Sequence, residues 1–159
     1  MRIITVCLGN ICRSPAAEAV LKRALQRSGL DSQVSVRSAG TADYHVGEQP
    51  HELTRAVGTD LGYEFTTVGA QFRPEDLDEQ DLVLVMDESN LADVRALVAD
   101  PEVEAKVRMF GEFASDVESA GVREVPDPWG NPRPVFEEMY RQIEDAADGV
   151  VAAIRHGRV

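Results

Sequence analysis

Two residue types that can handle phosphate lie six positions apart near the start of the chain. Cys7 and Arg13 belong to the segment CLGNICRSP (7–15), which follows an apolar run and precedes a helical pattern. A loop that leaves a strand and opens a helix directs several backbone N–H groups at one point, where the helix dipole adds positive charge. This environment favours the thiolate form of Cys7, and the guanidinium of Arg13 matches phosphate oxygens. The segment therefore predicts phosphoryl transfer to a cysteine nucleophile.

The residues between Cys7 and Arg13 suit a loop that closes around an anion. Gly9 lets the backbone approach the anion, Asn10 tolerates positive φ, and Ser14-Pro15 suits a helix start. The alternative is a buried structural Cys7 with Arg13 making surface contacts, because a Cys and an Arg at this spacing are weak evidence alone. The strand before the loop and the helix after it favour the functional interpretation.

A second segment whose residues could take part in catalysis is Val125–Gly130. In it Asp127 lies between two prolines, and Trp129 follows the second of them. A rigidly held carboxyl group can protonate a leaving oxygen and later activate water. The alternative is a proline-stiffened turn before the last helix, a role that the segment fills in either case.

The elements that must position these residues alternate between strand and helix. Strands are predicted at 2–6, 34–37, 82–86 and 106–109, and the last helix is predicted to start between 131 and 134. Two further apolar stripes predict helices over 53–61 and 91–98. Such alternation predicts an α/β fold: a single-domain, three-layer sandwich with a four-stranded parallel sheet and helices on both faces. Ligands bind beyond the carboxyl ends of such strands, where the loop after the first strand lies.

Composition excludes several classes of protein. The 159 residues carry a formal net charge of −12, which argues against nucleic-acid binding. No apolar run is long enough for a membrane span and no secretory signal opens the chain, so we expect no membrane association and a cytoplasmic location. The only two cysteines share one loop and the three histidines are scattered, so no metal site is expected.

The segment from Cys7 to Ser14 resembles the phosphate-binding loop of the low-molecular-weight protein tyrosine phosphatases, and the resemblance covers nearly the whole chain. It implies one phosphatase domain over residues 1–159 that hydrolyses phosphotyrosine in proteins without a cofactor and releases inorganic phosphate. A tyrosine kinase is a candidate partner. Cys7 is then the nucleophile, Arg13 the phosphate ligand and Asp127 the general acid and base. The substrate-binding residues implied are Leu8, Gly9, Asn10, Ile11, Cys12, Ser14, Tyr44 and Trp129.

The resemblance also bears on Ser38-Ala39-Gly40-Thr41, which in the family packs against the phosphate loop, with the serine helping to hold it. By residue type alone this segment is a turn. Tyr44 is by the same reasoning an exposed loop tyrosine, but in the family an aromatic residue at this place forms part of the wall of the substrate crevice. The chain departs from the family at Thr67 and Ala70, near which many members have His and Arg, so the partner of Asn10 stays open. Asp87–Asn90 is interpreted as a helix cap rather than a catalytic segment.

Other activities on the same fold remain as alternatives. Arsenate reductases need further cysteines that this chain lacks, and the protein-arginine phosphatases usually carry Thr where this chain has Ile11. A phosphotyrosine-binding module is the alternative outside catalysis, expected if Cys7 or Asp127 were missing. We also expect the loop to be redox-sensitive, with Cys12 capturing an oxidised Cys7. The other interpretation of Cys12 is a small buried residue that fills space.

Overall fold

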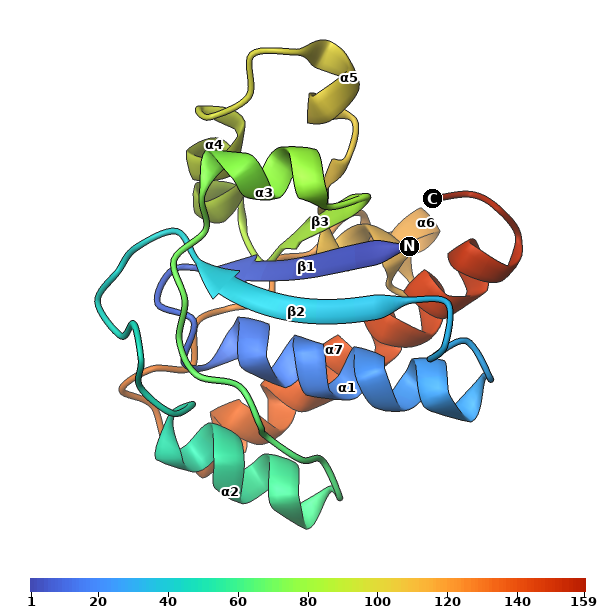
Figure 1. The fold of residues 1–159 in the computed structure, drawn as a ribbon. Helices are drawn as coiled ribbons and strands as arrows, with labels where there is room; N and C mark the ends of the chain where they lie inside the picture. The colour runs from blue at the N-terminus through green and yellow to red at the C-terminus, as the bar shows by residue number, and fades with distance from the viewer.

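A four-stranded parallel sheet forms the centre of the computed structural model, which describes residues 1–159 (Figure 1). The strands are β1 (Arg2–Cys7), β2 (Ser35–Gly40), β3 (Leu82–Val85) and β4 (Val107–Met109). Their order is β2-β1-β3-β4, and every pairing is parallel. The prediction of four parallel strands is therefore confirmed, with β2 reaching Gly40 rather than residue 37.

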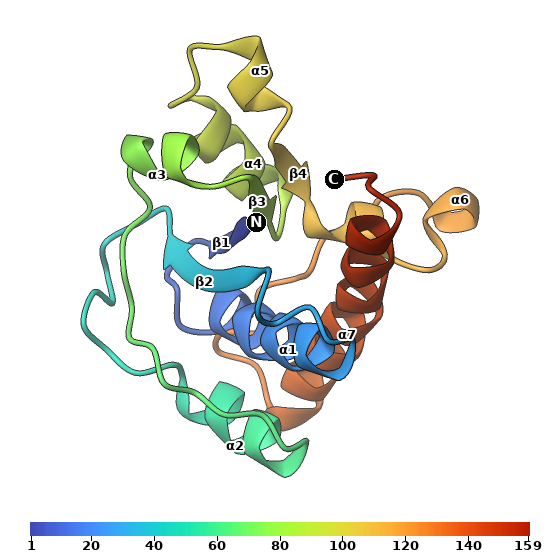
Figure 2. The ribbon, with the colours of Figure 1, turned by 45° about the vertical axis from the view of Figure 1, so that its right-hand side comes forward.

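Helices cover both faces of this sheet, which confirms the predicted architecture (Figures 1 and 2). One face carries α1 (Arg13–Arg27), α2 (Glu52–Asp60) and α7 (Arg133–Arg155), and the other carries α3 (Pro74–Glu79) and α4 (Glu88–Arg95). Short helical turns complete the second half of the chain: α5 (Pro101–Glu104), η1 (Phe110–Phe113) and α6 (Val117–Ala120). None of the helices combines the length and the apolar character that crossing a bilayer requires.

Alternating side chains of the strands build two apolar cores. Ile3 and Leu84 pack with α1 and α7 on one face, whereas Ile4 and Val85 pack with Val94 of α4 on the other. The apolar stripe of α7 packs against the first of these cores, with Ile154 at its end only partly buried and these residues fully buried: Phe136, Met139, Tyr140, Ile143, Ala147 and Val150. The strand alternation and the helix periodicity thus fix which face each element presents to the sheet.

The helix predicted through residue 98 is shorter than expected. α4 ends at Arg95, and the N–H groups of Leu97 and Val98 bond to carbonyls three residues back, which closes the chain into a turn. Asp100-Pro101 then starts the next helix, α5. The prediction was wrong at this end, and Leu97 is left 45% exposed.

The strand order positions the site. β1 lies between β2 and β3, and the chain leaves β1 for α1 on one face and β3 for α4 on the other. The loops after β1 and β3 therefore diverge from neighbouring strand ends, the arrangement that creates a ligand crevice in open α/β sheets.

Candidate active site

The loop from Leu8 to Cys12 joins β1 to α1 and holds a row of unpartnered backbone donors. None of the backbone N–H groups from Leu8 through Arg13 donates a hydrogen bond to a protein acceptor. Asn10 is the one residue other than glycine with positive φ, at 55°, and this curls the loop back on itself. Free donors at the start of a helix of 15 residues form a cradle suited to an anion.

Side chains behind the loop fix this conformation. The hydroxyl of Ser14 accepts a hydrogen bond from Asn10 Nδ2 at 2.7 Å and lies 3.1 Å from Cys7 Sγ. Asn10 Oδ1 accepts from the backbone N–H of Ala70 at 2.9 Å. A main-chain donor of the α2–α3 loop thus supplies the partner of Asn10 that the sequence left open.

The end of β2 packs tightly against the loop. A Cβ atom at Gly40 would lie 2.7 Å from the carbonyl oxygen of Leu8, so only glycine fits there. The carbonyl of Ala39 accepts from the hydroxyl of Ser14 at 3.2 Å. Ser38 itself turns away, and its hydroxyl donates to Glu18 of α1 at 2.5 Å. Its contact is therefore with α1 rather than with the loop.

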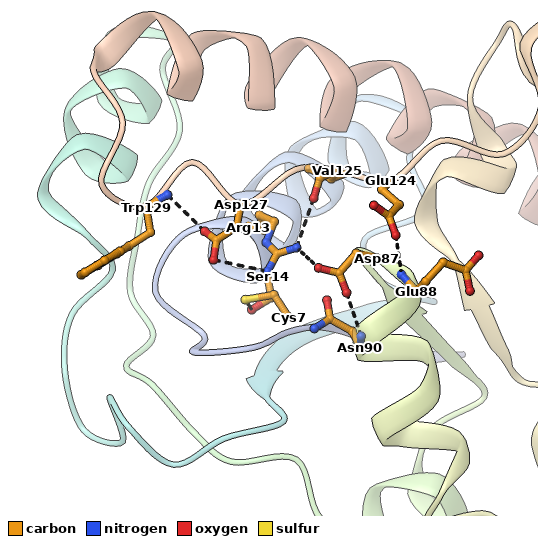
Figure 3. Close-up of polar contacts among 10 residues, drawn as sticks. All are labelled: Cys7, Arg13, Ser14, Asp87, Glu88, Asn90, Glu124, Val125, Asp127 and Trp129. Carbon is orange, nitrogen blue, oxygen red and sulfur yellow. Dashed lines mark hydrogen bonds and ion pairs between the residues drawn. The ribbon is translucent and has the colours of Figure 1, made fainter.

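Arg13, the first residue of α1, is buried and held by two loops that are distant in sequence. Its Nη1 donates to Asp87 Oδ2 at 2.5 Å and to the carbonyl of Val125 at 3.1 Å, and its Nη2 lies 3.6 Å from Asp127 Oδ2 (Figure 3). Burial alone lowers the pKa of this guanidinium, but the negative charges around it outweigh burial and raise the pKa above its usual value. Arg13 is therefore a permanently charged group with a fixed direction.

Asp127 enters the site from the loop before α7. The N–H of Val125 bonds to the carbonyl of Met86 at 2.8 Å, which ties this loop to the end of β3. Asp127 Oδ1 then accepts from the N–H of Trp129 at 3.1 Å, while its other oxygen faces Arg13 (Figure 3). Two prolines and two hydrogen bonds hold a carboxyl group that is 45% exposed beside the cradle.

A cavity of about 230 Å³ lies over the cradle. Nine of the residues predicted for the site line it: Cys7, Leu8, Gly9, Ile11, Cys12, Arg13, Tyr44, Asp127 and Trp129. Tyr44 and Trp129 are exposed at 69% and 63%, as walls of an open crevice are. Asn10 and Ser14 lie behind the cradle instead of in the cavity, where they hold its shape.

Comparison with known proteins identifies the family. The model of the low molecular weight phosphotyrosine protein phosphatase family matches residues 2–158. The chain belongs to this family. A low molecular weight protein-tyrosine-phosphatase of Streptomyces coelicolor is 38% identical over 154 residues, covering 97% of this chain and 93% of its own. The crystal structure of a protein tyrosine phosphatase from Entamoeba histolytica has a TM-score of 0.94 at 31% identity, covering 100% of this chain and 99% of its own.

One solved structure with the same fold is named for a different activity. A YwlE arginine phosphatase structure, in which a mutant carries a phosphorylated active-site serine, has a TM-score of 0.87 at 25% identity. The match covers 99% of this chain and 98% of the YwlE chain. Family membership therefore establishes the phosphatase fold and leaves the phosphorylated amino acid to be argued from the pocket.

Two residues of the site escaped the sequence reasoning. Asp87 was assigned to a helix cap, and its Oδ1 does cap α4 through the N–H of Asn90, but Oδ2 binds Arg13. The signal for this second role was the position of Asp87 directly after β3, next to β1. His45, one of the three scattered histidines, also lines the pocket, with its ring against Gly9 and Nδ1 2.7 Å from Glu48 Oε2.

Cys12 lies in the pocket wall, but its thiol is not suited to act as a nucleophile. Burial raises the pKa of the Cys12 thiol to about 12, and nearby negative charge on Asp127 and Cys7 acts in the same direction. Both cysteines are free. At neutral pH Cys12 is therefore a protonated, apolar neighbour of Cys7.

Proposed function

We propose that this chain hydrolyses phosphotyrosine in proteins through a phosphocysteine intermediate. The observation that carries the proposal is the cradle: six unpartnered backbone N–H groups and the buried Arg13 surround a pocket that Cys7 lines. These donors match the equatorial oxygens of a phosphoryl group in transfer. Such a cradle supplies positive charge locally on a chain whose net charge is −12.

In the first step Cys7 Sγ attacks phosphorus, and the bond between phosphorus and the tyrosyl oxygen breaks. Asp127 delivers a proton to the departing oxygen, so that tyrosine leaves neutral. The one hydroxyl hydrogen of Ser14 has two acceptors within reach, the carbonyl of Ala39 at 3.2 Å and Cys7 Sγ at 3.1 Å, and it turns to bond to the sulfur when Cys7 is a thiolate. That bond holds the sulfur in line and later eases its departure.

In the second step a water molecule attacks the phosphocysteine. Asp127, now a carboxylate, takes a proton from this water, the S–P bond breaks, and inorganic phosphate leaves with Cys7 restored as the thiolate. Asp87 takes no proton in either step. Its contact with Nη1 of Arg13 orients the guanidinium that stays on the phosphoryl oxygens throughout.

Protein-arginine phosphatase is the second candidate, because the YwlE structure shares the fold. The pocket favours an aryl substrate instead: Ile11 presents an apolar wall, and two exposed aromatic side chains, Tyr44 and Trp129, flank the opening. Arsenate reduction lacks support, since Cys7 and Cys12 are the only cysteines of the chain.

One assay separates these activities. The purified protein is incubated in EDTA with p-nitrophenyl phosphate, phosphotyrosine, phosphoarginine and arsenate, and the rates are compared. We expect turnover of the two aryl phosphates and a higher kcat/KM for phosphotyrosine than for phosphoarginine. A preference for phosphoarginine would replace the proposed substrate, and a requirement for a metal would overturn the mechanism.

A further inference from the structure

A groove lies next to the active-site pocket. It has a volume of about 550 Å³ and is walled by the end of α4, the residues before α3 and the loop after β2. Leu8 and Tyr44 line both this groove and the pocket, so the two hollows share one ridge. A larger cavity of about 610 Å³ along α1 shares no residue with the pocket.

The groove presents apolar surface to solvent. Leu8, Tyr44 and Leu97, which are 40%, 69% and 45% exposed, belong to the few large apolar side chains that the protein leaves open to water. The buried side chains of Phe72 and Val94 form its base. Leu97 is available because α4 ends at Arg95 and the following turn exposes it.

The groove also holds an unpaired cation. Arg73 lines it, is exposed, and has no carboxylate within 4.0 Å, unlike Arg13 and Arg37, which form ion pairs. Asp93 on the wall formed by α4 is likewise without a cation partner. The positive charge of Arg73 attracts a negative group to this part of the groove, and the negative charge of Asp93 on the α4 wall offsets part of that attraction.

We propose that this groove binds the stretch of the substrate protein next to the phosphotyrosine, with an apolar side chain on Leu8 and Leu97 and an acidic side chain at Arg73. The inference rests on the proposed function, because it extends the pocket that would hold the phosphotyrosine itself. Because Leu8 and Tyr44 line both hollows, the groove lies directly beside that pocket. Because Arg73 is positively charged, it favours an acidic residue of the substrate at this point of the groove.

The test uses phosphotyrosine peptides in which a single Glu or Lys is placed at each position on either side of the phosphotyrosine in turn. We expect one region of the peptide to favour Glu over Lys by about fivefold in kcat/KM, the scale of an exposed ion pair. Arg73→Glu reverses this preference, and Asp93→Asn strengthens it. Arg158→Glu, a charge reversal at the far C-terminus, is the matched control and leaves the preference unchanged.

A second variant tests the apolar part of the groove. Leu97→Ser lowers kcat/KM for peptides with Leu beside the phosphotyrosine and leaves p-nitrophenyl phosphate unaffected, because that substrate ends within the pocket. Equal effects of Arg73→Glu and Arg158→Glu, or an unaltered preference in both, refute the groove as a binding site. Failure of the unmutated protein to hydrolyse free phosphotyrosine refutes the proposed function instead, so the two outcomes are distinguishable.

Discussion

Arg13 and Asp87, which are 74 residues apart in sequence, form an ion pair between the first turn of α1 and the loop after β3, with Nη1 and Oδ2 2.5 Å apart. The same carboxylate caps α4, since Oδ1 accepts from the N–H of Asn90 at 2.7 Å. One side chain therefore couples the direction of the guanidinium to the start of a helix. Replacing the carboxylate separates these two roles.

Asp87→Asn keeps an oxygen for the cap but removes the charge that orients Arg13. We expect kcat/KM for phosphotyrosine to fall roughly tenfold while the melting temperature stays close to that of the parent. Asp87→Ala loses the cap as well and costs about 1 kcal/mol of stability in addition. Steady-state kinetics and thermal unfolding of both variants measure the difference. Unchanged kinetics in Asp87→Asn would leave Asp87 as a cap alone.

Cys7→Ser removes the proposed nucleophile but leaves the cradle intact. We expect turnover to disappear while phosphate and vanadate still bind, because the backbone donors and Arg13 remain. Calorimetric titration with phosphate gives the binding measurement. Cys12→Ser is the matched control, and it retains turnover. More than a few per cent of residual activity in Cys7→Ser would remove Cys7 from the mechanism.

Asp127→Asn removes the proposed general acid. We expect aryl phosphates with poor leaving groups to slow by about a hundredfold or more, and those with good leaving groups to slow far less, since only the former need the proton. The limb of the pH profile that Asp127 contributes disappears as well. A series of substituted phenyl phosphates measures this dependence. An equal loss across the series assigns Asp127 a structural role.

Ile11→Thr tests the apolar wall of the pocket. We expect the ratio of kcat/KM for phosphoarginine to that for phosphotyrosine to rise roughly tenfold, because a polar side chain replaces an apolar one next to the substrate. Both substrates are assayed on the same preparation of each variant. If the ratio does not move, Tyr44 and Trp129 carry the discrimination instead.

Peroxide treatment tests the role of Cys12. We expect peroxide to inactivate the enzyme, phosphate to protect it, and thiols to restore it, with a crosslink between Cys7 and Cys12 visible as a loss of two hydrogens by mass spectrometry. Because burial raises the pKa of Cys12 to about 12, its thiolate fraction and hence the rate of crosslinking rise about tenfold per pH unit below that value.

Cys12→Ser is the control for this redox prediction. Inactivation still occurs in this variant, but recovery with thiols is poor because peroxide oxidises the uncaptured sulfenic acid at Cys7 further, to the sulfinic acid that thiols do not reduce. Full recovery of Cys12→Ser, together with no crosslink in the parent enzyme, would restrict Cys12 to packing.

Much of the site was predictable from the sequence because its central part is contiguous. The parts of the cradle from Cys7 to Ser14 follow one another in sequence: a strand, a loop with Gly9 and Asn10, and a helix start bring the backbone donors and Arg13 to the same strand end, where distant residues then hold them. The alternation of strands and helices likewise fixed a parallel sheet with the cradle at its carboxyl edge. Asp127 was identifiable because its flanking prolines and Trp129 are neighbours in sequence.

Only the tertiary structure decided which distant residues complete the site. Asp87 reaches Arg13 because β3 lies next to β1, and the order of strands in a sheet is not written in any local spacing. The same holds for the N–H of Ala70 on Asn10 and for Glu18 on Ser38, which are contacts between segments brought together by packing. The early end of α4, which exposes Leu97 beside Arg73, also required the folded chain, since an apolar periodicity does not mark where a helix stops.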